Sequence, residues 1–134
     1  MTKGNALVID DDCLVRATLQ LFLEMDGWAV TAASNGKRAM AILEGHAFDV
    51  IVTDLMMPEM EGIETIREIR KACIQTPILA ISGGFAARNS PAGSGVIDFL
   101  RMSRELGASG TLTKPFTSSE FIGKINEILK ESAR

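Results

Sequence analysis

The sequence predicts a single α/β domain in which a five-stranded parallel sheet is covered by helices on both faces. Two observations lead to this prediction. Short apolar runs alternate along the chain with longer segments whose apolar residues recur at helical spacing. Several of the short runs are almost continuous in Val, Ile and Leu, which is typical of strands buried on both faces of a sheet. Regular alternation of the two patterns is characteristic of a doubly wound fold.

Five apolar runs are predicted to be the strands. The runs at residues 6–9, 50–53 and 78–81 carry the near-continuous pattern, and residues 28–32 and 110–113 supply the second and fifth strands. Parallel neighbours need crossover connections, and these crossovers are right-handed, so the intervening helices must lie on both sides of the sheet. We therefore expect a doubly wound sheet of flavodoxin-like order 2-1-3-4-5.

The segments between these runs are predicted to be helices. Residues 37–44 and 96–106 form the second and fourth helices, and the other three carry apolar residues at helical spacing. The residues at this spacing are Leu14, Leu21, Phe22 and Met25 in the first helix, with the polar Thr18 among them, Ile63, Ile66 and Ile69 in the third, and Phe121, Ile122, Ile125, Ile128 and Leu129 in the fifth.

The connection at residues 83–95 is long for this fold and is rich in Gly, Ser and Ala. It matches neither G-x-G-x-x-G nor the phosphate-binding loop of nucleotide hydrolases, so it is not predicted to hold a nucleotide. Its simplest interpretation is a surface loop.

Composition excludes several classes of protein. A chain of 134 residues that is 46% apolar can form one domain with a core, which we expect to span about residues 5–130 of 1–134. The net charge of -3 offers no basic surface for nucleic acid, and no apolar run approaches the ~20 residues of a membrane span. His46 is the only histidine, which argues against a histidine-based metal site or catalytic triad. Cys13 and Cys73 are expected to be reduced thiols in a cytoplasmic protein.

Polar residues with chemical potential follow four of the five predicted strands. They are three acids after the first strand, one acid after the third, a serine after the fourth and a lysine after the fifth: Asp10, Asp11, Asp12, Asp54, Ser82 and Lys114. Ligands of open α/β sheets bind beyond the carboxyl ends of the strands, so these residues are predicted to form one site.

The residue types at this edge suggest phosphoryl chemistry. Clustered carboxylates repel one another, and a hard cation such as Mg²⁺ or Mn²⁺ relieves that repulsion. One carboxylate could then attack a phosphoryl group, with Lys114 and the metal neutralising the phosphoryl oxygens and Ser82 donating a hydrogen bond. Taken singly, Asp12 is most simply a helix N-cap, Ser82 a turn residue and Lys114 a solvated lysine. Their joint placement favours the functional interpretation.

Four segments resemble the receiver domain of two-component response regulators. "VIDDD" followed by Arg16 is similar to the acidic pair and first helix of that family, and "DLMMPEMEG" is similar to its phosphoacceptor segment. "ILAIS" matches its hydroxyl residue, and "GASGTLTKPF" its lysine and the following proline. The resemblance extends from residue 7 to about residue 129 and implies a flavodoxin-like fold.

The resemblance also implies a role for each site residue. Asp54 would be the phosphoacceptor. Asp11 and Asp54 would bind Mg²⁺ or Mn²⁺ together with the backbone carbonyl of Met56, and Asp10 would act mainly through water.

Two further residues of the resemblance would contact the phosphoryl group. Ser82 would donate a hydrogen bond to it and Lys114 would pair with it, and the Lys114–Pro115 peptide would be cis. The chain departs from the family at Thr111, where an aromatic partner of the hydroxyl residue is usual. We therefore expect the segment at 83–95, which directly follows Ser82, to change most on phosphorylation.

The resemblance implies partners as well. The donor would be a histidine kinase or a histidine phosphotransfer protein, and the signal would pass to a downstream protein target rather than to nucleic acid or a membrane. The protein would not be an enzyme beyond catalysing its own phosphorylation and dephosphorylation. Because residues 1–134 contain no output domain, a stand-alone cytoplasmic regulator is the expectation.

Two alternatives stay open from the sequence. A haloacid-dehalogenase-type phosphatase would use an Asp-x-Asp pair, which Asp10 and Asp12 could supply. The chain could also be the receiver part of a larger DNA-binding regulator.

Overall fold

The computed structural model describes residues 2–55, 61–83 and 101–132. Its strands are β1 (Asn5–Ile9), β2 (Ala29–Ala33), β3 (Val50–Asp54), β4 (Ile78–Ser82) and β5 (Gly110–Thr113). All neighbouring strands pair in parallel, in the order β2-β1-β3-β4-β5. The predicted fold class and strand order are therefore confirmed.

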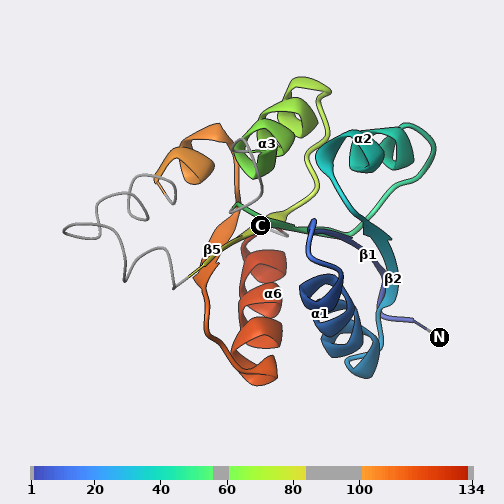
Figure 1. The fold of residues 1–134 in the computed structure, drawn as a ribbon, viewed down its shortest axis with the longest axis vertical. Helices are drawn as coiled ribbons and strands as arrows, with labels where there is room; N and C mark the ends of the chain where they lie inside the picture. Colours follow the sequence, from blue (N-terminus) through green and yellow to red (C-terminus); the bar gives the residue numbers. More distant parts are fainter. Residues whose placement is uncertain (1, 56–60, 84–100, 133–134) are drawn as a thin grey trace.

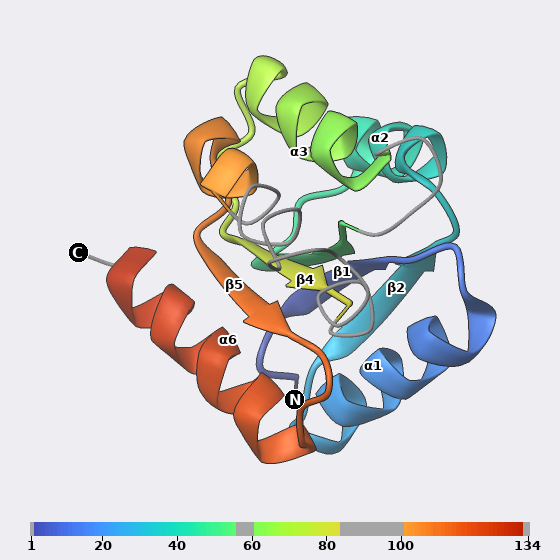
Figure 2. The same ribbon diagram turned by 60° about the vertical axis from the view of Figure 1, so that its left-hand side comes forward.

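Helices cover both faces of this sheet (Figure 1). They are α1 (Cys13–Met25), α2 (Gly36–Gly45), α3 (Glu61–Lys71) and α6 (Ser118–Ser132), and residues 101–106 are also helical. Helices α1 and α6 lie on one face, whereas α2, α3 and the helix at 101–106 lie on the other, and the turned view in Figure 2 shows the same two layers. The predicted helix at 96–106 is confirmed for 101–106, and its first half lies outside the described residues, as does the loop beyond Gly83. No helix in the described parts of the chain is long and apolar enough to cross a membrane.

The two helix layers explain the continuous apolar runs in the central strands. Residues that alternate along a strand point to opposite faces. In β1, Leu7 and Ile9 belong to the core beneath α2 and α3, and Ala6 and Val8 belong to the core beneath α1 and α6. All four side chains are completely buried. From Ala6 to Ile9, β1 therefore carries apolar residues only, and Asp10 is the first polar residue after them.

Two predictions about these elements need correction. The helical spacing of Leu14, Leu21 and Met25 located α1, but these side chains are 73%, 54% and 79% exposed, and the face against the sheet carries Leu19 and Leu23 instead. Apolar residues surround α1 on several sides, so their spacing alone did not identify its buried face. The second strand was also placed one residue too early, since β2 begins after Trp28.

The end of the molecule opposite the candidate site is held by a half-buried arginine. Arg70 at the end of α3 donates hydrogen bonds to the carbonyl oxygens of Gly107 (3.1 and 2.8 Å), Ile74 (2.6 Å) and Thr76 (2.9 Å). Gly107 has φ +121° and lies against the Arg70 side chain, so a residue with a Cβ would be strained there. One guanidinium thereby joins the segments that lead into β4 and β5.

The carboxyl ends of the strands are level with one another. In the register of the sheet, Ile9 pairs with Thr53, Asp54 pairs with Ile81, and Ser82 pairs with Thr113. The residues that end these strands, or directly follow them, therefore meet at one edge between the two helix layers.

Candidate functional site

The turn from β1 into α1 presents three consecutive aspartates in three different environments. Asp10 is buried, with 1% exposure, and its Oδ1 accepts a hydrogen bond from the backbone N–H of Asp12 at 2.9 Å. Asp12 Oδ1 accepts from the N–H groups of Leu14 (2.9 Å) and Val15 (3.3 Å). Asp12 is thus the N-cap of α1, as its simplest interpretation predicted. Asp11 is exposed, and its carboxylate makes no hydrogen bond or ion pair within the described parts of the chain.

The role of Asp12 weakens the phosphatase alternative. An Asp-x-Asp enzyme needs a second carboxylate that is available for acid–base chemistry. Here that carboxylate satisfies two orphan amides at the start of α1.

Asp54 at the end of β3 lies beside a cation. Its carboxylate Oδ2 is 2.9 Å from Nζ of Lys114, and the two side chains are 6% and 29% exposed, respectively. The backbone N–H of Lys114 donates to the carbonyl of Ser82 at 2.9 Å, which fixes the start of the lysine relative to β4. The Lys114–Pro115 peptide is cis, as predicted. Asp54, Ser82 and Lys114 therefore lie together, as the sequence predicted.

Glycine at position 62 allows α3 to begin close to Asp54. A Cβ built on Gly62 would collide with the carbonyl oxygen of Asp54 and with Cα of Leu55. The start of α3 therefore packs directly against the backbone that carries the Asp54 side chain.

Ser82 has a hydroxyl partner that sequence reasoning missed. Its side chain is completely buried, and Oγ lies 3.5 Å from Oγ1 of Thr113, a long and weak hydrogen bond. Thr111, which stands where the resemblance places the partner of the hydroxyl residue, pairs in register with Ala80, two residue pairs earlier. Predicted strand ends alone could not give this register.

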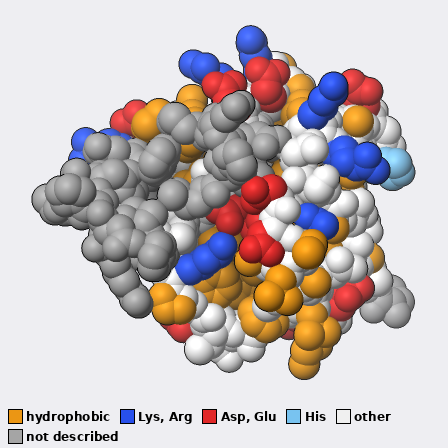
Figure 3. Space-filling model, viewed as in Figure 1, with side chains coloured by type: hydrophobic (Ala, Val, Ile, Leu, Met, Phe, Trp, Pro, Cys, Tyr) orange, Lys and Arg blue, Asp and Glu red, His pale blue; other side chains and the backbone are white. Residues whose placement is uncertain are grey.

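The acids form the electrostatic centre of the site. Burial, together with the negative charge of Asp54, raises the pKa of Asp10 from its ordinary 3.8 to about 7, although the Asp12 N–H and the Lys114 charge oppose the shift. Figure 3 shows acidic side chains gathered in the middle of this face, with basic side chains on either side and apolar side chains below. Negative charge is concentrated here without full compensation.

The donor set suits a hard divalent cation. Oδ2 of Asp10 is buried and has no hydrogen-bond partner among the described residues. Together with the Asp11 and Asp54 carboxylates, it gives a set of oxygen ligands of the kind that Mg²⁺ and Mn²⁺ prefer. The described residues contain no group of three or more His, Cys, Asp or Glu side chains close enough to hold a metal by themselves. A cation here would therefore need carbonyl oxygens or waters as well. Met56, whose carbonyl was expected to contribute, lies outside the described residues.

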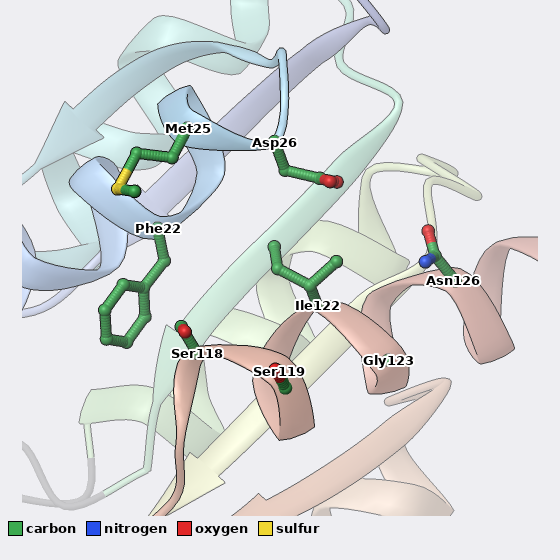
Figure 4. Close-up of a pocket in the computed structure, with 8 residues that line it drawn as sticks. All are labelled: Phe22, Met25, Asp26, Ser118, Ser119, Ile122, Gly123 and Asn126. Carbon is green, nitrogen blue, oxygen red and sulfur yellow. The ribbon is translucent and has the colours of Figure 1, made fainter.

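Among the described residues, one hollow near α1 lies away from the predicted site residues and another borders them. A hollow of about 410 Å³ between the end of α1 and the start of α6 is lined by Phe22, Met25 and Asp26, with Ser118, Ser119, Ile122, Gly123 and Asn126 opposite (Figure 4). Its single carboxylate, Asp26, pairs with Lys3 at 2.9 Å. This hollow contains none of the predicted site residues. A second hollow of about 350 Å³, mainly apolar, runs along α1 to Lys114 and Pro115.

Comparison with protein families agrees with this geometry. Residues 6–126 match the family model described as the response regulator receiver domain. The transcriptional regulatory protein CpxR of Klebsiella pneumoniae is 35% identical over 129 residues, which are 96% of this chain and 50% of that protein. The cell cycle transcriptional regulator CtrA of Caulobacter vibrioides is 32% identical over 96% of this chain and 51% of its own length. The chain thus spans about half the length of these curated relatives.

Solved structures show the same fold. The receiver domain of the Francisella response regulator 1452 has a TM-score of 0.79 and 31% identity, covering 97% of this chain and 99% of that one. The chemotaxis response regulator CheY4 of Vibrio cholerae has a TM-score of 0.77 and 28% identity, covering 95% of this chain and 99% of that one.

Proposed function

The chain belongs to the response regulator receiver domain family, and on that premise we propose that it accepts a phosphoryl group on Asp54 in a two-component system or phosphorelay. The observation that supports this most strongly is the pairing of Asp54 with Lys114 at 2.9 Å, near Oδ2 of Asp10, to which no described residue donates a hydrogen bond. The site thus brings together a carboxylate, a lysine cation and a second carboxylate oxygen that could face a metal.

The reaction is a displacement at phosphorus. A carboxylate oxygen of Asp54 forms a bond to the phosphoryl group, and the bond from phosphorus to the donor nitrogen breaks, so the electron pair of that bond leaves with the histidine. Lys114 neutralises a phosphoryl oxygen after leaving Oδ2 of Asp54, and Ser82 leaves Thr113 to donate a hydrogen bond to another. Both contacts exist before the reaction and are exchanged during it.

A divalent cation completes this proposal. Asp10, Asp11, Asp54 and the backbone carbonyl of Met56 would hold Mg²⁺ or Mn²⁺, with Asp10 acting mainly through water. The bound metal would supply positive charge to the phosphoryl oxygens as the bond to Asp54 forms.

The donor is proposed to be a histidine kinase or histidine phosphotransfer protein. The apolar hollow that reaches Lys114, and the exposed Leu14 and Leu21 on α1, suit a protein surface better than a small polar donor. The output is proposed to be a contact with a downstream protein.

A second candidate follows from the length of the relatives. The relatives are transcriptional regulators about twice as long as the matched region. The chain would then act as the receiver part of a DNA-binding regulator, and its phosphorylation chemistry would be the same.

Intact-mass spectrometry after incubation with acetyl phosphate tests the proposal. Wild-type protein should gain one phosphate with Mg²⁺ and none with EDTA, and Asp54→Asn should gain none. Equal labelling of Asp54→Asn would refute the assignment of the acceptor.

A further inference from the structure

We propose that Arg16 is a positioning residue for the divalent cation: it holds the Asp10–Asp11 peptide and does not occupy a carboxylate. This inference rests on the proposed function, because it concerns the same cation. It starts from a contact that the sequence pattern did not reveal.

Arg16 is half-buried near the start of α1, and its side chain turns back toward β1. Its Nη1 donates a hydrogen bond of 2.7 Å to the carbonyl oxygen of Asp10. This distance lies at the short end of the range for N–H···O bonds, as charge-assisted bonds do. The contact therefore fixes one face of the peptide that joins Asp10 to Asp11.

Two further hydrogen bonds hold Asp10 itself. The backbone N–H of Asp10 donates to the carbonyl of Ala33 in β2 at 3.1 Å, and Asp10 Oδ1 accepts from the N–H of Asp12. With Arg16 on the Asp10 carbonyl, Asp10 is held at three points, two on its backbone and one on its side chain. The exposed carboxylate of Asp11 thus projects from a rigid turn.

Arg16 binds a backbone carbonyl although an acid lies at a suitable spacing for an ion pair. It lies four residues after Asp12, a spacing at which an acid and an arginine can pair on a helix. Asp12 instead caps α1, and Arg16 makes no ion pair within 4.0 Å among the described residues. The guanidinium therefore leaves the carboxylate of Asp11 and Oδ2 of Asp10 available to the cation. Lys114 differs, because it occupies Oδ2 of Asp54.

Groups outside the coordination sphere that orient ligands contribute strongly to metal affinity. Removing such a partner typically weakens binding by about 10-fold or more. We expect a loss of about 10-fold in Mg²⁺ affinity for Arg16→Met, which keeps the apolar stem and removes both the charge and the hydrogen bond. Arg16→Lys keeps the charge but replaces the planar donor with an ammonium. Its affinity should lie between those of wild type and Arg16→Met.

The experiment measures Mg²⁺ binding by calorimetry in the unphosphorylated proteins and, separately, the rate of labelling by acetyl phosphate against Mg²⁺ concentration. Arg38→Met is the matched control: Arg38 is an exposed residue in the first turn of α2, and its contact to Asn35 is made by its backbone N–H. It removes the same charge near the same edge. Circular dichroism in EDTA checks folding.

A positioning role predicts a split between binding and rate. For Arg16→Met, the half-saturating Mg²⁺ concentration for labelling should rise by the same factor as the dissociation constant, with an unchanged rate at saturating Mg²⁺. Unchanged Mg²⁺ affinity in Arg16→Met overturns the proposal, and so does an equal loss in Arg38→Met or a slower saturated rate alone. If Arg16→Met does not fold, Arg16→Lys decides: weaker binding supports the role and wild-type binding overturns it. A wild-type protein that binds no Mg²⁺ refutes the proposed metal site itself.

Discussion

Replacing Asp10 with Asn should stabilise the folded protein in Mg²⁺-free solution at neutral or higher pH. The folded protein raises the pKa of Asp10 from 3.8 to about 7, a difference of about 3 units. At about 1.4 kcal/mol per unit, ionised Asp10 costs the fold at most about 4 kcal/mol. The Asn side chain keeps an oxygen that can accept the hydrogen bond from the Asp12 N–H. Two effects reduce the gain in stability: the Asn amide group needs an acceptor, and Lys114 loses one acidic neighbour. We therefore expect a gain of about 1–3 kcal/mol.

The gain should depend on pH in a defined direction. The folded state holds the Asp10 proton more tightly than the unfolded state, so the free energy of unfolding of the wild type falls as pH rises from about 4 to about 7 and then levels off. Asn does not titrate. The difference between the two proteins should be small near pH 4 and complete above about pH 7.

Urea unfolding in EDTA at several pH values measures this difference. Glu44→Gln, which removes a carboxylate from the exposed surface of α2, serves as control and should change stability little at any pH. If Asp10→Asn lowers stability, or raises it by the same amount at pH 5 and pH 8, then the buried charge of Asp10 does not destabilise the folded protein.

Three further substitutions test other parts of the structure. Lys114→Met should lower the free energy of unfolding in EDTA by about 1–2 kcal/mol, measured with urea, because the buried Asp54 carboxylate loses a cation at 2.9 Å. The loss should be smaller in saturating Mg²⁺. Unchanged stability both in EDTA and in Mg²⁺ would contradict the pairing. Arg70→Met should cost about 2–4 kcal/mol by thermal unfolding, because three carbonyls lose their charged donor, whereas the exposed Arg67→Met should be near neutral. Gly62→Ala should cost about 2 kcal/mol or more and slow acetyl phosphate labelling, since its Cβ collides with the Asp54 backbone; wild-type behaviour would mean that α3 shifts freely.

The sequence predicted those features that depend on a strand being buried on both faces. Leu7 and Val8 are neighbours in β1 that pack into opposite cores. The sequence of β1 is therefore a continuous apolar run, and the first acid after that run shows where the strand ends. The same reasoning located Asp54 and Ser82 at the ends of β3 and β4. Because the strands are parallel, these residues could be predicted to lie at one edge of the sheet even though the loop conformations were not known.

Features that depend on register or on backbone acceptors were not predictable in this way. Ser82 lies opposite Thr113 rather than Thr111 because the pairing of β4 with β5 sets the partner, and a shift of two residues leaves the apolar pattern unchanged. Arg16 and Arg70 both donate to carbonyl oxygens, which every residue carries, so no residue type in the sequence indicates their partners. The buried face of α1 was missed because Leu14 and Leu21 continue its apolar pattern onto the solvent side.

Locating the phosphoryl group within the chain tests the central claim most directly. Reduction of the phosphorylated protein with borohydride converts an aspartyl phosphate to homoserine, which tandem mass spectrometry assigns to a residue. The proposed reaction predicts homoserine at position 54 alone, formed only when the donor and Mg²⁺ are both present. Homoserine at position 10 or 12 would instead support the Asp-x-Asp phosphatase alternative, and would contradict the assignment of Asp54 as the phosphoacceptor.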